Sequence, residues 1–230
     1  MNAPLNLAPI KAVIFDMDGL LLDTEGIYTE VTQIIAQRYG RHFDWTIKQN
    51  IIGRGALDLA RYVVQALGLP ISAEEFLRIR EPLLQERFPH APAMPGAREL
   101  VEHLKSRQIP IAIGTSSSSG SFAQKATRHR DWFALFDTIV TADDPEVGAA
   151  KPAPDIFLTA ARRLGVAPAD CLVFEDSPFG VTAAKAAGMT AIAVPDAAMA
   201  DEKYAHADRI LRSLDSFPLQ AYGLPVFETA

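Results

Sequence analysis

The chain has 230 residues, a formal net charge of −6 and 49% hydrophobic residues. This length suits one large domain or a domain with an insert, and the apolar fraction suits a well-filled core. The acidic balance argues against broad nucleic-acid binding, which usually leaves a basic footprint. No run approaches the ~18 apolar residues that are needed to span a bilayer.

The first residues and the cysteine usage indicate the compartment. The start, MNAPLNLAPIK, lacks the charged beginning and the apolar stretch of a signal peptide. Cys171 is the single cysteine, which excludes an internal disulfide and fits a reducing compartment. It opens an apolar run, as a small buried residue would, although a reactive thiol is the alternative. We expect a soluble, cytoplasmic monomer without a membrane or nucleic-acid partner.

Five short apolar runs predict strands. In chain order they lie at residues 11–15, 110–114, 138–141, 171–174 and 190–194. They are rich in Ile, Val and Ala and do not alternate with polar residues, which is typical of parallel strands covered on both faces. Helical patterns at 97–107, 156–164 and 177–188 lie between them. This alternation predicts an α/β protein with a doubly wound, mostly parallel, Rossmann-like sheet.

The stretch from 24 to 92 interrupts this alternation, because it shows helical patterns and no convincing strand. The helical patterns lie at 24–39, 56–67 and 72–88. We therefore predict an all-helical cap domain at 23–95, inserted into a Rossmann-like catalytic core that comprises 1–22 and 96–230. The segments 22–24 and 89–95 are the expected hinges of this lid.

Two aspartates, Asp16 and Asp18, follow the first predicted strand, and Gly19 allows a sharp turn there. The carboxyl ends of strands are where open α/β sheets bind ligands, so both carboxylates can approach one point. By themselves these residues are also ordinary turn formers.

A run of small residues, GTSSSSG, follows the second predicted strand at 114–120. Its composition is that of a flexible linker. Its place between a strand and a helical segment favours a phosphate-binding loop, in which the Thr115 hydroxyl and backbone N–H groups would contact phosphate oxygens.

Two further loops carry charged residues. Lys151 is flanked by alanines and prolines, so it is either a solvated surface charge or a fixed charge that compensates phosphate. Glu175 and Asp176 end the fourth predicted strand, where they would cap the next helix or complete a magnesium site. The order Asp-x-Asp, Thr/Ser, Lys, Glu-Asp, each at its own strand edge or loop, favours the chemical interpretation of all four signals.

At these positions the sequence resembles the haloacid dehalogenase-like hydrolases that carry a helical cap after the first strand. The matching pieces are FDMDGLLLDTE, GTSSS, KPAPDIF and FEDSPFGVTAAKAAGM. Within the family it is most similar to the pseudouridine-5′-phosphatase group and to related sugar and polyol phosphatases, through MPGA, DDPEV, ATRHRDWFALF and GLPVFE. The resemblance covers nearly the whole chain.

The resemblance implies catalytic roles for the matching residues. Asp16 would attack phosphorus and form an aspartyl-phosphate, and Asp18 would protonate the leaving oxygen and then activate water. Thr115 would hold a phosphoryl oxygen with help from Ser116, and Lys151 would neutralise the transferring group. Because Asp18 must be protonated for the first step, we expect its pKa to be raised by burial and by its carboxylate neighbours.

The resemblance also implies a Mg²⁺ cofactor. Its ligands would be Asp16, the backbone carbonyl of Asp18 and the Asp176 carboxylate, with Glu175 assisting directly or through water. Mg²⁺ together with lysine would offset the repulsion between an anionic phosphate monoester and a carboxylate nucleophile.

Substrate selection is expected from the cap and from the serine loop. The turn with Gly53 and Arg54 matches the region that reaches over the active site in relatives, although Arg54 is equally well explained as a surface residue. Glu25 and Tyr28 follow the aspartate loop and are expected to face the cleft. Ser116 and Ser117 are further candidate substrate-binding residues.

The expected function is Mg²⁺-dependent hydrolysis of a small phosphate monoester, with pseudouridine 5′-phosphate or a similar nucleotide, sugar or polyol phosphate as substrate. A β-phosphoglucomutase-type phosphosugar mutase is the first alternative. Tyr28 replaces a histidine that such mutases usually have, and Ser118 and Ser119 replace their frequent Lys-Asn pair, so both departures weaken it. A non-catalytic phosphate-binding protein is the second alternative.

Overall fold

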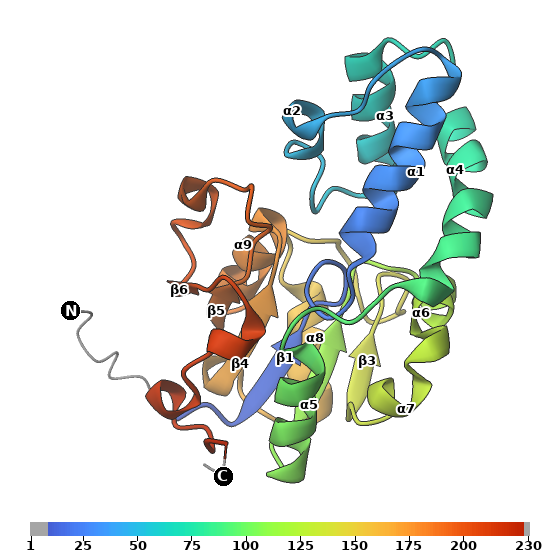
Figure 1. Cartoon of the computed structure of the whole chain (residues 1–230). Coiled ribbons are helices and arrows are strands. Elements are labelled where there is room, and N and C mark those ends of the chain that lie inside the picture. Colours follow the sequence, from blue (N-terminus) through green and yellow to red (C-terminus); the bar gives the residue numbers. More distant parts are fainter. Residues whose placement is uncertain (1–8, 228–230) are drawn as a thin grey trace.

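The computed structural model describes residues 9–227 and has a six-stranded parallel sheet at its centre (Figure 1). The strands are β1 (Ala12–Phe15), β2 (Ile111–Gly114), β3 (Thr138–Val140), β4 (Cys171–Glu175), β5 (Thr190–Ala193) and β6 (Arg209–Ile210). Their order across the sheet is β3-β2-β1-β4-β5-β6, and every neighbouring pair is parallel. The predicted fold class and five strands are confirmed, each strand differing by a single residue at one end, and β6 is an addition.

Each face of the sheet contributes to its own hydrophobic core. Val13 and Phe15 of β1 belong to one core, which α5 and α7 cover, while Ala12 and Ile14 belong to the other, which α8 and α9 cover. The helices are α5 (Ala97–Ser106), α6 (Ser119–Lys125), α7 (Arg130–Phe133), α8 (Asp155–Leu164) and α9 (Pro178–Ala186). Burial on both faces explains why the strands read as continuous apolar runs. Cys171 is buried, which raises the pKa of its thiol to about 11.

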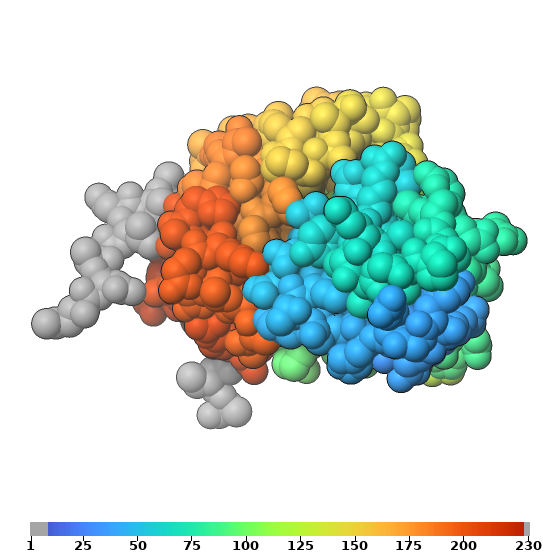
Figure 2. Space-filling view, turned by 90° about the horizontal axis from the view of Figure 1, so that it is seen from above, coloured from blue at the N-terminus to red at the C-terminus, as the bar shows by residue number. Residues whose placement is uncertain are grey.

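Four helices lie above the carboxyl edge of the sheet. They are α1 (Thr24–Arg38), α2 (Trp45–Lys48), α3 (Ala56–Leu67) and α4 (Ala73–Arg87). They pack around a third hydrophobic core of their own. Residues 24–92, all of which the structure describes, contain no strand. Seen from above, this blue-to-teal segment lies beside the orange and red C-terminal segments (Figure 2).

The chain passes between the two layers at two adjacent points. The Asp23 N–H donates to the Pro92 carbonyl at 2.9 Å, and the Met94 N–H donates to the Leu21 carbonyl at 2.9 Å. These contacts lie at the two expected hinges. We propose that the predicted cap boundaries, 23 and 95, mark the residues between which the helical layer moves as a lid.

Short 3₁₀ helices complete the chain. They are η1 (Phe88–His90), η2 (Ala126–Arg128), η3 (Pro168–Asp170), η4 (Asp201–Tyr204), η5 (Leu214–Ser216) and η6 (Leu219–Tyr222). Within residues 9–227, none of the helices combines the length and the apolar composition that a membrane span requires. Most of the N-terminal stretch that was compared with a signal peptide, and the last residue of the GLPVFE motif, lie outside the described residues.

Candidate active site

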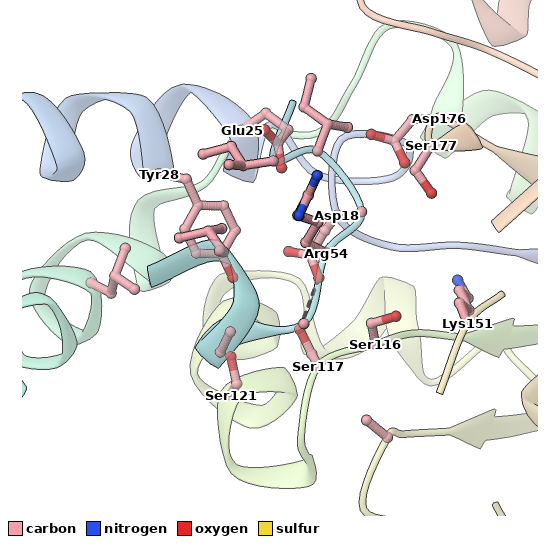
Figure 3. A pocket seen from close by; sticks show the side chains of 18 of the residues that line it. Asp18, Glu25, Tyr28, Arg54, Ser116, Ser117, Ser121, Lys151, Asp176 and Ser177 are labelled. Atoms are coloured by element: carbon pink, nitrogen blue, oxygen red, sulfur yellow. Dashed lines mark hydrogen bonds between the residues drawn. The ribbon is translucent and has the colours of Figure 1, made fainter. Parts of the chain in front are cut away.

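The candidate site lies where β1, β2 and β4 end side by side. Asp16 and Asp18 follow β1, Thr115 follows β2 and Asp176 follows β4, so three segments distant in sequence meet at one edge. The Asp16 N–H donates to the carbonyl of Phe174 at 3.0 Å, which fixes the two strand ends together. A cleft of about 470 Å³ separates this edge from the helical layer (Figure 3).

Lys151 joins two acidic residues at this edge. Its Nζ donates to Asp16 Oδ1 at 2.5 Å, to Glu175 Oε1 at 2.6 Å and to the Gly114 carbonyl at 3.0 Å. Burial alone lowers the pKa of Lys151, but the charges of Asp16 and Glu175 outweigh this effect and raise it. Burial raises the pKa of Asp16 to about 7, against the lowering effect of Lys151. The predicted convergence of Asp16 and Lys151 is therefore present.

Glu175 holds Lys151 in place. One carboxylate oxygen accepts from Lys151, and the other accepts from the backbone N–H of Ser177 at 2.9 Å and from its hydroxyl at 3.0 Å. Ser177 also caps α9, because its Oγ accepts from the Gly180 N–H at 3.0 Å. Both oxygens of Glu175 are thus engaged by protein donors. We infer a positioning role for Glu175, and its assistance to the metal, directly or through water, stays a prediction.

Gly180 provides the space for the Glu175 carboxylate, since a Cβ added there would overlap with it. We expect Gly180→Ala to displace Glu175 and Lys151 and to lower kcat by about 10²-fold or more. Gly120→Ala is the matched control, because Gly120 is also helical and its added Cβ meets nothing within 4 Å. The control should keep full activity and gain up to about 1 kcal/mol in unfolding free energy. Equal steady-state rates for the two variants would refute this role of Glu175.

Asp176 is a buried carboxylate without a protein donor. It is 8% exposed, and no hydrogen bond reaches its side chain from the described residues. Burial raises its pKa well above the usual range, and the charges of Glu175, Asp16 and Glu25 add to this effect. Gly19, with φ of +79°, brings the backbone so close that an added Cβ would overlap with the Asp176 carboxylate.

These features fit a divalent cation held by Asp16 and Asp176. Burial and the charges of neighbouring carboxylates raise the pKa of both groups, so a bound cation would favour their ionised forms. Residues 9–227 contain no group of three or more His, Cys, Asp or Glu side chains that could hold a metal. Mg²⁺ commonly uses only one or two carboxylates together with water and phosphate. The residues that would hold it are Asp16, Asp176 and, through its backbone carbonyl, Asp18.

The side chain of Asp18 faces a different set of donors. It accepts from Lys125 Nζ at 2.5 Å, from Thr24 Oγ1 at 2.6 Å and from Ser117 Oγ at 2.8 Å. Burial by itself raises the pKa of Asp18, but the charge and the hydrogen bond of Lys125 outweigh burial and lower it. The expectation of a raised pKa was therefore wrong for this structure. Its cause is a buried lysine that the sequence interpretation had not considered.

Lys125, at the end of α6, is the main residue that the sequence interpretation missed. Its side chain is fully buried, and Nζ also donates to Tyr28 Oη at 3.0 Å and to Ser117 Oγ at 2.7 Å. It lies over the ring of Phe88, 4.6 Å from the centroid. The one available signal was its spacing of three residues from Phe122. Phe122 packs against the core, and this spacing places Lys125 on the same side of the helix.

Replacing Lys125 should destabilise the protein, because it leaves the Asp18 carboxylate without its cation. We expect Lys125→Met to lower the unfolding free energy by about 2–4 kcal/mol. Lys105→Met is the control, since Lys105 forms an ion pair with Asp137 at the surface and should cost less than about 1 kcal/mol. Urea unfolding of both variants measures this difference. Equal losses of unfolding free energy would show that the Lys125–Asp18 pair stabilises the protein no more than the surface pair does.

The serine loop supplies both buried and cleft-lining residues. Thr115 is fully buried, and its Oγ1 accepts from the Ser117 N–H at 3.1 Å and lies 3.4 Å from Asp18 Oδ2. Ser116 and Ser117 line the cleft. The phosphate contact expected of Thr115 stays a prediction, and in this structure its hydroxyl braces the loop.

All four predicted cap residues line the cleft (Figure 3). Burial raises the pKa of Glu25, and Tyr28 contacts Lys125. Gly53, with φ of +79°, lies where an added Cβ would be 2.9 Å from Ser177 Cβ, so the cap turn touches the core loop. Arg54 Nε donates to the Asn50 carbonyl at 2.5 Å.

Comparison with known proteins shows the family. The sequence model described as haloacid dehalogenase-like hydrolase matches residues 10–188. The chain belongs to this family, as the resemblance implied. Its relatives named as phosphatases are phosphoric monoester hydrolases, the enzyme class to which this chain belongs.

Three relatives illustrate the similarity. "(DL)-glycerol-3-phosphatase 2" of Arabidopsis thaliana is 48% identical over 224 residues, covering 95% of this chain and 93% of that protein. "Probable pseudouridine-5′-phosphatase" of Drosophila melanogaster is 44% identical over 224 residues, covering 96% and 97%. A family hydrolase from Deinococcus radiodurans, solved with bound phosphate and sodium, has a TM-score of 0.74 at 32% identity and covers 90% of this chain and 93% of that chain.

Proposed function

We propose that the protein is a Mg²⁺-dependent phosphatase that hydrolyses a small phosphate monoester through an aspartyl-phosphate on Asp16. The observation that carries this proposal is the position of Lys151, whose Nζ contacts Asp16 at 2.5 Å at the base of the cleft. Asp176, a buried carboxylate to which no residue of 9–227 donates a hydrogen bond, supports the cation. When bound, Mg²⁺ would offset the repulsion between Asp16 and phosphate and stabilise charge on the phosphoryl oxygens.

The reaction follows from the roles of three side chains. Asp16 attacks phosphorus, the bond to the leaving oxygen breaks, and Asp18 gives its proton to that oxygen. Lys151 neutralises Asp16 and the transferring group. Asp18 then takes a proton from water, which attacks the phosphorus of the aspartyl-phosphate, releases inorganic phosphate and restores Asp16.

The lowered pKa of Asp18 places a condition on the first step. In the free site its carboxylate is ionised beside Lys125. A phosphate dianion bound nearby adds negative charge and raises the pKa of Asp18, so that substrate binding favours uptake of the proton that the leaving group needs. The ionised form suits the second step, in which Asp18 acts as a base.

For the substrate we propose pseudouridine 5′-phosphate or a similar nucleotide, sugar or polyol phosphate. The names of the two relatives, a glycerol-3-phosphatase and a pseudouridine-5′-phosphatase, support this range. The contacts of the two serines that stand at the Lys-Asn positions of the mutases weaken the mutase alternative further. Ser118 Oγ accepts from the Ser121 N–H, and Ser119 bonds Asp143 through both its N–H and its hydroxyl, so both serines are engaged at the start of α6.

Metal removal tests the proposal together with a substrate screen. We expect phosphate release from nucleoside, sugar and polyol monophosphates in the presence of Mg²⁺, complete loss with EDTA, and recovery when Mg²⁺ is added back. Release that persists in EDTA would contradict the metal role. Isomer interconversion faster than phosphate release would favour a mutase, and binding without turnover under any metal would favour the non-catalytic alternative.

The cytoplasmic location and the monomeric state stay predictions. Light scattering tests the monomeric state.

A further inference from the structure

Arg80, on α4, is a buried cation that faces the cleft without an acceptor. It is 8% exposed and lines the cleft. Its Nε is buried and has no hydrogen-bond partner, and no described residue forms a hydrogen bond or an ion pair with its guanidinium. Its one close partner is the ring of Tyr28, 5.6 Å from Cζ to the centroid. Burial lowers the pKa of Arg80, and the charges of Tyr28 and Glu81 offset this effect only in part.

The other cations that line or border the cleft all have acceptors. The partners are Asp16 and Glu175 for Lys151, Asp18 for Lys125, Glu25 for Lys48 and the Asn50 carbonyl for Arg54. Among the described cations that line or border the cleft, Arg80 alone lacks an acceptor. A buried donor without an acceptor costs free energy, and a buried charge costs more. A group that enters the cleft and accepts from Arg80 would remove this cost.

The position of Arg80 specifies where that group lies. The Tyr28 side chain contacts Arg80 through its ring and Lys125 through its hydroxyl, and Lys125 binds Asp18. Arg80 is therefore linked to Asp18 through two intervening side chains, those of Tyr28 and Lys125. Apolar residues of the helical layer line the cleft there, among them Phe43, Ile51, Leu84 and Phe88. An acceptor that reaches Arg80 belongs to the far end of the leaving group.

We propose that Arg80 is the specificity-determining residue of the cap, and that it binds sp² oxygen atoms, of a carboxylate or of a ring carbonyl, at the far end of the leaving group. A guanidinium is a planar fork of donors that matches such oxygens better than it matches single hydroxyls. A site built to hydrogen-bond a substrate group rejects analogues that lack the group, because its own donors stay unpaired. This inference rests on the proposed phosphatase function.

Two matched substrate pairs test the proposal on the wild-type enzyme with Mg²⁺. 3-Phosphoglycerate and glycerol 3-phosphate differ by a terminal carboxylate. Pseudouridine 5′-phosphate and phenyl C-riboside 5′-phosphate differ by the carbonyls and the N–H groups of the base, of which only the carbonyls can accept from Arg80. We expect at least one pair to show a kcat/KM higher by about 30-fold or more for the member with the sp² oxygens. The pair that shows it identifies the source of the oxygens, and equal values within both pairs would overturn the proposal.

Variants then assign the effect to Arg80. Arg80→Met should lower kcat/KM of the preferred substrate by about 30-fold, mainly through KM, and change its matched partner by less than about threefold. Arg80→Lys keeps the charge without the fork and should recover part of the loss. Arg78→Met is the control on the same helix, since Arg78 is exposed and paired with Glu75, and it should leave both values unchanged.

The outcomes separate this inference from the proposed function. No hydrolysis of any of the four substrates by the wild-type enzyme would contradict the phosphatase itself. If Arg80→Met hydrolyses both members of a pair with an equal loss of kcat/KM, the role of Arg80 is contradicted and the proposed phosphatase function is not. If Arg80→Met does not fold, as circular dichroism would show, the wild-type substrate pairs and Arg80→Lys decide.

Discussion

Asp16→Asn should abolish phosphate release, with a loss of about 10⁴-fold or more in kcat. An amide of the same shape cannot displace the leaving oxygen, so no covalent intermediate forms. The variant should still fold, because Lys151 keeps Glu175 as a partner at 2.6 Å and the repulsion between Asp16 and its acidic neighbours disappears. Steady-state phosphate release and thermal unfolding measure the two effects.

Asp131→Asn is the control for this experiment, since Asp131 is exposed on α7 and does not line the cleft. It should keep the wild-type rate. A fully active Asp16→Asn would refute the nucleophile. An inactive variant that is also unfolded would refute the claim that the fold tolerates the neutral amide.

Lys151→Met should damage both catalysis and stability. The variant leaves Asp16 and Glu175 next to each other at the edge of the sheet without the cation that both contact. Breaking a buried ion pair by removing one partner costs about 3–5 kcal/mol, and the lower end is expected here because Asp16, with its raised pKa, can take up a proton. We expect kcat to fall by about 10³-fold because the transferring group loses its positive charge.

Lys185→Met is the matched control, because Lys185 pairs with Asp208 at the surface. It should lose less than about 1 kcal/mol and keep its activity. Urea unfolding and steady-state kinetics on the same preparations compare the variants. A Lys151→Met enzyme as stable and as active as Lys185→Met would contradict the proposed site.

The different stability effects that we expect for Asp16→Asn and Lys151→Met come from one arrangement. Lys151 is shared between two carboxylates, so removing one acid leaves a satisfied pair, whereas removing the lysine leaves two acids facing each other. Measuring both variants therefore tests the geometry of the site independently of its chemistry.

The sheet could be predicted because five of its strands are apolar on both faces. Val13 and Ile14, neighbours in β1, are both fully buried, and they belong to different cores. Such runs are visible in a single sequence. β6 could not be predicted, because it comprises only two residues, both partly exposed, and exists through its pairing with β5.

The acidic and basic residues of the edge could also be predicted, because each lies at a strand end or in a loop after a strand, and the strand ends of a parallel sheet meet. Asp16, Lys151 and Glu175 lie together as the spacing of motifs indicated. What the motifs could not predict is which acid pairs with which base. Glu175 is occupied by Lys151 and Ser177, and this pairing becomes visible only in three dimensions.

Lys125 and Arg80 show a second limit of sequence interpretation. Both lie in helices among polar residues, where a lysine or an arginine is normally solvated. Lys125 is 107 positions from Asp18 in the sequence, yet it determines the direction in which the pKa of Asp18 is shifted. A long-range contact of this kind has no local pattern, so the burial of these cations could be found only from the packed structure.

Rapid-quench labelling is the most direct test of the central claim, that Asp16 becomes phosphorylated. The Mg²⁺ enzyme is mixed with a ³²P-labelled substrate that it hydrolyses, quenched in acid within one turnover, and digested for mass spectrometry. We expect an acid-stable, hydroxylamine-sensitive label on the peptide that contains Asp16, and no label in Asp16→Asn. Steady hydrolysis with no label on the wild-type protein, or with the label on another residue, would contradict the mechanism.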